Sequence, residues 1–228
     1  MKKLIPLLAF AVVILTAAAQ DNPNPSVYGD IPDYGEKYLS PDFVKLDKKA
    51  GLLVACRTGD ELLKINPETK AVESRIELGG HPSGITVSPD GKFAYVTIAA
   101  PKGEILKISL EDSKIAERAP AGHMPRAVII SADGKTLYFA NQFENVVRAF
   151  DSKTLKEKAR GKAVRDPFAL ALSKDGSKVF AANQLPEPKG GLYEENIGAA
   201  VSVFDAKTLK TLAKIDLPNG SIKAQDIK

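Results

Sequence analysis

The two histidines of this 228-residue chain stand at matching positions before a proline, in residues 79–83 (GGHPS) and 122–126 (GHMPR). Imidazole nitrogens from two neighbouring elements can share a zinc, copper or iron ion. His81 and His123 therefore raise a metal or haem-ligand hypothesis, with Asp166 as the candidate for a third ligand. The alternative, which we favour, is that each histidine closes its turn by a hydrogen bond to the neighbouring element.

Other polar residues recur at the same loop positions. We expect the prolines to set the backbone so that the residues beside them meet around one mouth: His81, His123, Arg126, Arg165 and Asp166. A second set follows the second strand of each repeat and contains Arg57, Thr58, Asp60, Asn141, Gln142, Glu144, Asn145, Asn183 and Gln184. In this set Asn141 and Asn183 are candidates for ligand contact. The favoured alternative is that an asparagine at a strand end closes its loop through side-chain hydrogen bonds.

These loops connect copies of one hairpin. Residues 84–88 (GITVS) and 93–97 (FAYVT) are rich in β-branched and aromatic residues, and the Pro-Asp-Gly between them favours a tight turn. The same hairpin pattern recurs at residues 127–140 and 169–182. The serines that precede the turn in the three copies are 43 and then 42 residues apart. A period of this length, built from strands and turns, is typical of propeller blades.

The inner strands of each repeat are almost continuously apolar. In the last strand polar and apolar residues alternate, which is typical of an outer edge strand with one solvated face. We therefore predict an all-β fold, a β-propeller of four-stranded antiparallel blades. About four blades are present, at residues 39–80, 81–122, 123–163 and 164–220 of a propeller that occupies 39–228. Because a propeller closes into a ring to hide its strand edges, we expect a front portion of a longer chain. The alternative is a complete four-bladed protein.

The fourth repeat carries an insertion. Its Asp-x-x-Thr turn lies 54 residues after the preceding one, where the earlier spacing is 42, and the extra residues fall within 185–199. Insertions in repeat proteins map to loops on one face, often the binding face. The predicted partner loop is the tip of this insertion: Tyr193, Glu194, Glu195 and Asn196. The alternative is a tolerated surface excursion.

The first 19 residues have the pattern of an export signal. Lys2 and Lys3 precede an apolar run at residues 4–16, and three alanines at 17–19 form a small-residue cleavage site. The apolar run is too short to cross a bilayer comfortably, so we expect cleavage rather than an uncleaved transmembrane anchor. Residues 20–38 are an extended leader. We therefore expect an exported protein, located in the periplasm, at the cell surface or outside the cell.

Charge and cysteine content exclude further classes of protein. Without the signal the chain has 30 basic and 28 acidic side chains, and this nearly neutral net charge argues against a nucleic-acid partner. The single cysteine, Cys56, lies within a predicted strand and has no disulfide partner in the chain. We expect it to be a small buried hydrophobe rather than a reactive thiol.

The ends of the second strands carry a resemblance to a known family. The quartets are Val54-Ala55-Cys56-Arg57, Tyr95-Val96-Thr97-Ile98, Tyr138-Phe139-Ala140-Asn141 and Phe180-Ala181-Ala182-Asn183. With Ser-x-Asp-Gly turns before the last three, they resemble the YVTN family of β-propeller repeats over residues 39–220. The resemblance implies an exported, mostly seven-bladed propeller, grouped with quinoprotein dehydrogenases, the nitrous oxide reductase amino-terminal domain and lactonase propellers. Some members carry a cytochrome c domain, but this chain lacks a Cys-x-x-Cys-His motif.

No motif in the sequence specifies an enzyme. A nucleophile elbow, a phosphate-binding glycine loop, a zinc-protease motif and paired carboxylates at catalytic spacing are all lacking. We predict a non-catalytic binding or scaffold propeller that presents loops to a protein or cell-envelope partner, with a small molecule as the alternative ligand and no cofactor evident. The rival, suggested by the resemblance, is a redox or hydrolytic module, quinoprotein-like, cytochrome-c-linked or lactonase-like, whose catalytic part lies beyond residue 228. A structural role in a surface layer is a third hypothesis.

Overall fold

A computed structural model describes residues 39–186, 198–218 and 221 of the chain. The predicted export signal at 1–19 and the leader at 20–38 lie outside these residues. The described part contains sixteen β-strands and no helix, arranged as four four-stranded antiparallel sheets. The predicted all-β class and the four-stranded antiparallel blades are confirmed. Among the described residues, no helix is long and apolar enough to cross a membrane.

Each sheet consists of four strands that are consecutive in the chain. The first sheet contains β1 (Pro41–Asp47), β2 (Gly51–Cys56), β3 (Glu61–Ile65) and β4 (Val72–Glu77). The second contains β5 (Pro82–Val87), β6 (Phe93–Ile98), β7 (Gly103–Ser109) and β8 (Lys114–Gly122). The third contains β9 (Pro125–Ile130), β10 (Thr136–Asn141), β11 (Val146–Asp151) and β12 (Glu157–Lys162). The fourth contains β13 (Pro167–Leu172), β14 (Lys178–Asn183), β15 (Ala200–Asp205) and β16 (Thr211–Asp216).

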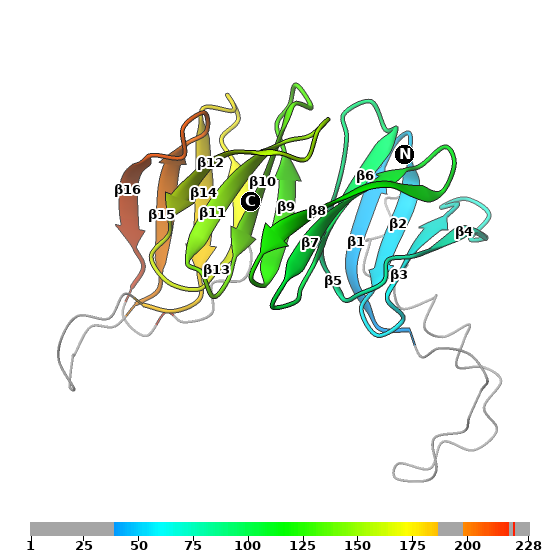
Figure 1. Cartoon of the computed structure of the whole chain (residues 1–228), viewed down its shortest axis with the longest axis horizontal. Helices are drawn as coiled ribbons and strands as arrows, with labels where there is room; N and C mark the ends of the chain where they lie inside the picture. The colour runs from blue at the N-terminus through cyan, green and yellow to red at the C-terminus, as the bar shows by residue number, and fades with distance from the viewer. Residues whose placement is uncertain (1–38, 187–197, 219–220, 222–228) are drawn as a thin grey trace, which may run out of the picture. The chain divides into compact units, whose positions relative to one another are not determined.

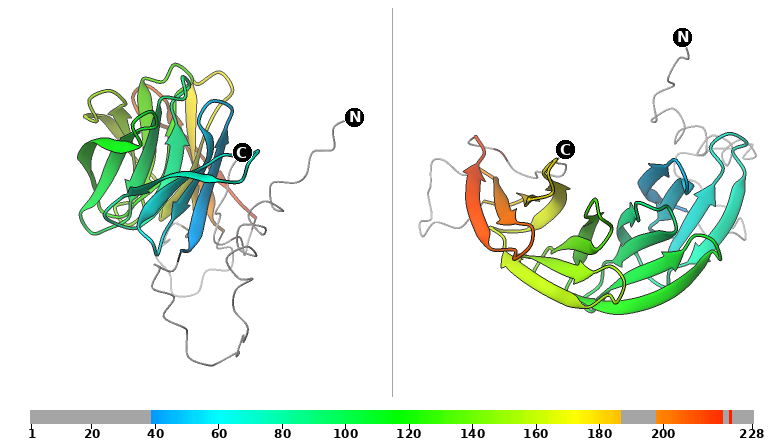
Figure 2. Two further views of the ribbon diagram at one scale, coloured as in Figure 1. Left: turned by 90° about the vertical axis from the view of Figure 1, so that its right-hand side faces the viewer. Right: turned by 90° about the horizontal axis from the view of Figure 1, so that it is seen from above.

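The four sheets lie side by side within one compact unit, Tyr38–Lys228. Their first strands β1, β5, β9 and β13 contact one another in chain order (Figure 1). Seen from above in Figure 2, the sheets form an arc with these first strands on the concave side and the last strands on the convex side. Neighbouring blades of a β-propeller are arranged in this way, so the concave side corresponds to the central channel.

The Ser-x-Asp-Gly turns connect the first and second strands by a network of local hydrogen bonds. The Ser88 hydroxyl donates to Asp90 Oδ1 at 2.5 Å and accepts from the Phe93 amide at 2.9 Å. Asp90 Oδ1 also accepts from the Lys92 amide, and Gly91 takes a φ of 74° that favours glycine. The same network surrounds Asp133 and Asp175 in the next two sheets. The turn is therefore determined locally, which explains why it is recognisable from sequence.

The hydrogen bonds of these turns lower the pKa of the turn aspartate, as Asp175 shows. Hydrogen bonds from the Ser173 hydroxyl, and from the amide and hydroxyl of Ser177, lower the pKa of Asp175 from 3.8 to about 2. A lowered folded-state pKa stabilises the turn above pH 3.8, and this contribution disappears as the pH falls towards 2. Carboxyl-carbon NMR titration should give a midpoint near 2 in the wild type and a higher midpoint, closer to 3.8, in Ser173→Ala. Equal midpoints would show that the serine does not bind the carboxylate in solution.

The hydrophobic core lies between the sheets, because both faces of each second strand are covered. In β6, Ala94 and Val96 pack against the first sheet, whereas Tyr95 packs against the third. The Tyr95 hydroxyl donates to the Ser152 carbonyl at 3.1 Å, and the equivalent Tyr138 donates to the Ala206 carbonyl of the fourth sheet at 2.9 Å. The tyrosine therefore joins the second sheet to the third and the third sheet to the fourth.

Cys56 is buried at the end of β2, as predicted. Burial, together with the nearby Glu61 carboxylate, raises the pKa of its thiol to about 11. The thiol therefore stays protonated at neutral pH, which is the state of an unreactive packing residue.

The first strand of every sheet is irregular at one place. Pro41, Pro82 and Pro167 pair with the ends of β2, β6 and β14, and one extra residue then bulges out before pairing resumes. These bulged residues are Asp42, Ser83 and Phe168; in the third sheet the bulge falls one residue later, at Ala127. Bulges redirect side chains and are frequent beside functional sites. In this chain they lie where the first strands begin.

Candidate functional site

The candidate site is one end of the concave side, where the first strands begin and the second strands end. We call it the mouth and define it by Asp42, Arg57, Arg126, Asp166 and Phe168. Asp42, Arg126 and Phe168 come directly after the first prolines of β1, β9 and β13, and Arg57 follows β2. The proline and bulge pattern therefore places charged side chains from three sheets at the same end.

Arg126 is the central residue of the mouth. Its Nε donates to Gln142 Oε1 at 2.8 Å, and its guanidinium lies over the ring of Phe168, with Cζ 5.0 Å from the ring centroid. Burial lowers the pKa of Arg126, nearby Arg57 lowers it further, and Asp166 and Asp42 act in the opposite direction. The Arg126 side chain thus connects the third and fourth sheets and lies within electrostatic range of the first.

The charged neighbours of Arg126 are weakly or incompletely paired. Arg57 Nη1 lies 3.6 Å from Asp42 Oδ2, in a half-exposed ion pair. Asp166 has a φ of 55°, and its amide donates to Asn145 Oδ1 at 2.7 Å. Its carbonyl accepts from the Gln184 amide, while its buried Oδ1 has no hydrogen-bond partner among the described residues. A buried polar atom without a partner in a native fold calls for an explanation, such as a bound water or ion.

The two histidines contact different neighbours. His81 Nδ1 lies 2.7 Å from Asp60 Oδ1 and 3.0 Å from the Arg57 carbonyl, so its ring is bonded to the preceding sheet. The ring of His123 meets Phe143 edge to face at 5.4 Å. No group of three histidine, cysteine, aspartate or glutamate side chains suitable for a metal occurs in the described part of the chain.

Asn141 and Asn183 are fully buried at the ends of β10 and β14. The Asn141 amide nitrogen donates to the carbonyls of Ala121 and His123, and that of Asn183 donates to the Ala200 carbonyl at 2.7 Å. Both residues therefore close the loops around the mouth from within, while each Oδ1 has no partner among the described residues.

A cluster of charges supports the loop of His123. Glu144 Oε1 accepts from the His123 amide at 2.6 Å, and Glu144 Oε2 accepts from Arg148 Nη2 at 2.6 Å. Arg148, whose side chain is only 10% exposed, also donates to Glu157 at 2.9 Å. Hydrogen bonding to Arg160 lowers the pKa of Glu157, and Arg148 adds to this effect. Through Glu144, this cluster holds the loop of His123 in place.

Arg165 and the predicted partner loop do not contribute to this arrangement of described side chains. Arg165 is exposed beside Asp166, and its side chain forms no hydrogen bond or ion pair with a described residue. The predicted partner loop, with Tyr193, Glu194, Glu195 and Asn196, lies outside the described residues. Sequence reasoning did not select Asp42 or Phe168, although both directly follow the proline that begins a first strand. That shared position was the signal that could have identified them.

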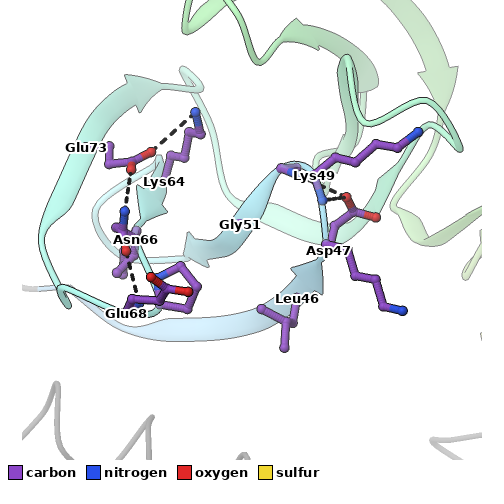
Figure 3. Close-up of a pocket in the computed structure, with 12 residues that line it drawn as sticks. Leu46, Asp47, Lys49, Gly51, Lys64, Asn66, Glu68 and Glu73 are labelled. Atoms are coloured by element: carbon purple, nitrogen blue, oxygen red, sulfur yellow. Dashed lines mark hydrogen bonds and ion pairs between the residues drawn. The ribbon is translucent and has the colours of Figure 1, made fainter.

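A pocket of about 650 Å³ lies at the opposite end of the first sheet, between the β1–β2 and β3–β4 turns (Figure 3). Several of its polar groups already have partners within the first sheet. Asp47 Oδ1 accepts from the amides of Lys49 and Ala50, and Glu73 accepts from Asn66 and pairs with Lys64 at 3.3 Å. We therefore place the candidate site at the mouth rather than in this pocket.

Comparisons with known proteins agree with the fold. A family model described as "Lactonase, 7-bladed beta-propeller" matches residues 55–157. The structure resembles Kuenenia stuttgartiensis hydrazine synthase, with a TM-score of 0.71 and 20% identity over 85% of this chain and 54% of that one.

A functionally unknown protein from Desulfotomaculum acetoxidans is also similar, with a TM-score of 0.65 and 16% identity over 79% of this chain and 57% of that one. The chain thus spans little more than half the length of the solved structures that it matches. A search of curated proteins found no significant match. At this level of identity the matches show the β-propeller fold.

Proposed function

We propose that this chain is an exported, non-catalytic β-propeller that binds a cell-envelope partner through its mouth. The observation that carries the proposal is the convergence of Arg57, Arg126 and Asp166, from three sheets, at one end of the concave side. A rigid sheet scaffold that presents loops at one end suits recognition, because the loops can vary without disturbing the core. The basic and apolar N-terminal pattern of residues 1–19 supports export.

Phe143 offers a contact for such a partner. Its side chain is 58% exposed on the loop after β10, beside His123 and one residue after Gln142. Exposed aromatic side chains at the centre of a binding surface are common anchors in protein interfaces.

Site-specific photocrosslinking tests the proposal in living cells. A photoreactive phenylalanine analogue at position 143 should give a discrete higher-mass product in the envelope fraction, and the same analogue at Val72 should not. Val72 is the matched control because it is similarly exposed, at 45%, but lies on the outer strand β4. Retention of the chain in the cytoplasm, or equal products at both positions, would refute the proposal. Lactone hydrolysis by the purified chain would instead favour the lactonase-like alternative.

A further inference from the structure

Arg126 has hydrogen-bond donors that the fold does not use. Its Nε is occupied by Gln142, but no described residue accepts a hydrogen bond from Nη1 or Nη2. Nor does a carboxylate of the described residues lie within ion-pair distance of this guanidinium. Neither Nη atom is among the buried polar atoms that lack a partner in the described part of the chain, so both are accessible to an incoming ligand.

The orientation of this guanidinium is fixed from two sides. Gln142 accepts the hydrogen bond from Nε, and Arg126 Cζ lies over the Phe168 ring, 5.0 Å from its centroid. What remains is the edge formed by Nη1 and Nη2, a fork whose spacing matches the two oxygens of a carboxylate. Because the side chain is already ordered, little further rotamer entropy is lost when a ligand binds.

The surrounding charges limit which anions fit. Arg57 adds positive charge near Arg126, whereas Asp42 and Asp166 add negative charge within the same range. Together with Arg126 itself, the two positive and two negative charges sum to zero, so the mouth has no excess positive charge that would favour a dianion over a monoanion. The mouth is therefore expected to prefer a carboxylate over sulfate or a phosphate dianion.

We propose that the Nη1–Nη2 edge of Arg126 binds the carboxylate of a ligand at the mouth, with Gln142 and Phe168 holding the guanidinium in place. This inference rests on the proposed binding role of the mouth and names the chemical group that is recognised there. The carboxylate can come from a small organic acid or from the C-terminus of a partner polypeptide. The competing explanation is that Arg126 only braces the third sheet against the fourth.

An NMR titration of the full chain distinguishes these explanations. Acetate is added up to about 100 mM at constant ionic strength, because screening alone changes surface electrostatics. We expect saturable shifts of the Gln142 and Phe168 amide signals and of the Arg126 Nε–H signal. Arg126→Lys keeps the charge but removes the fork, and should weaken acetate binding about tenfold. Arg165→Lys makes the same change at an exposed position beside the mouth and should leave the affinity within about twofold of the wild type.

The outcomes separate cleanly. Non-saturable shifts in the wild type, equal affinity in Arg126→Lys, or equal losses in both variants would overturn the carboxylate site. Tighter saturation by sulfate than by acetate would overturn the preference for one charge. The Arg126 Nε–H signal of the wild type reports acetate binding even if Arg126→Lys does not fold.

Tripeptides with a free or an amidated C-terminus identify the source of the carboxylate, since only the free form should compete if a polypeptide end binds. Photocrosslinking at position 143 does not depend on Arg126, so the binding role and the carboxylate site can fail separately.

Discussion

Replacing Phe139 with alanine is expected to destabilise the chain by about 3–5 kcal/mol. Phe139 lies in β10 and is completely buried, in the core between the second and third sheets. Its ring meets Phe150 edge to face with centroids 4.8 Å apart. The truncation removes this aromatic contact and leaves a cavity that the surrounding strands can fill only in part. Urea unfolding followed by circular dichroism measures the loss.

Phe143→Ala is the matched control for this experiment. The same side chain is removed four residues further along, where it is 58% exposed and contacts His123 from outside the core. We expect a change in the free energy of unfolding within about 0.5 kcal/mol. Similar losses in the two variants would contradict the assignment of β10 to the centre of a sheet packed on both faces.

Gly84→Ala is expected to cost about 3 kcal/mol, at the upper end for an overpacked core. Gly84 lies in β5, and a Cβ atom at this position would come within 2.8 Å of Ala127 Cα and 2.9 Å of two backbone nitrogens of β9. Ala127 is the bulged residue of β9, with a φ of 41°. The two first strands approach so closely that only a residue without a side chain fits between them. Because the neighbouring atoms are backbone, the sheets themselves must move apart.

Gly59→Ala provides the comparison, because its added Cβ would meet the flexible tip of the Leu39 side chain first. We expect a loss below about 1 kcal/mol, since a side chain can rotate away where a strand cannot. Thermal unfolding of the two variants, measured at one protein concentration, makes the comparison. A smaller loss for Gly84→Ala than for Gly59→Ala would show that β5 and β9 are further apart in solution than the structure indicates.

The fold could be predicted because its information is local and repeated. Each Ser-x-Asp-Gly turn is closed by bonds within five residues, so three copies reveal the hairpins directly. The second strands are covered on both faces and have continuous apolar sequences. In the fourth strands polar and apolar residues alternate. The sequence of the first sheet lacks this turn motif, yet Asp47 closes the same hairpin by accepting from the Lys49 and Ala50 amides.

The mouth could be predicted only in outline. Matching prolines indicated where the first strands begin, and this position includes Arg126 and Asp166. The side-chain partners could not be read from spacing, because they come from other sheets. Phe168 beneath Arg126 is 42 positions further along the chain, and the electrostatic effect of Asp42 on Arg126 reaches across from the first sheet.

The sequence by itself determined the class of the fold, the blade repeat and the turns, because these depend on hydrogen bonds and polar patterning between near neighbours. Only the tertiary structure decided which polar groups of the mouth are satisfied. His81 is bonded to Asp60 of the preceding sheet, whereas the Nη atoms of Arg126 have no hydrogen-bond partner among the described residues. Hydrogen-bond satisfaction depends on distances of a few ångströms between separate sheets. Those distances are set by how the sheets pack and by where each first strand bulges.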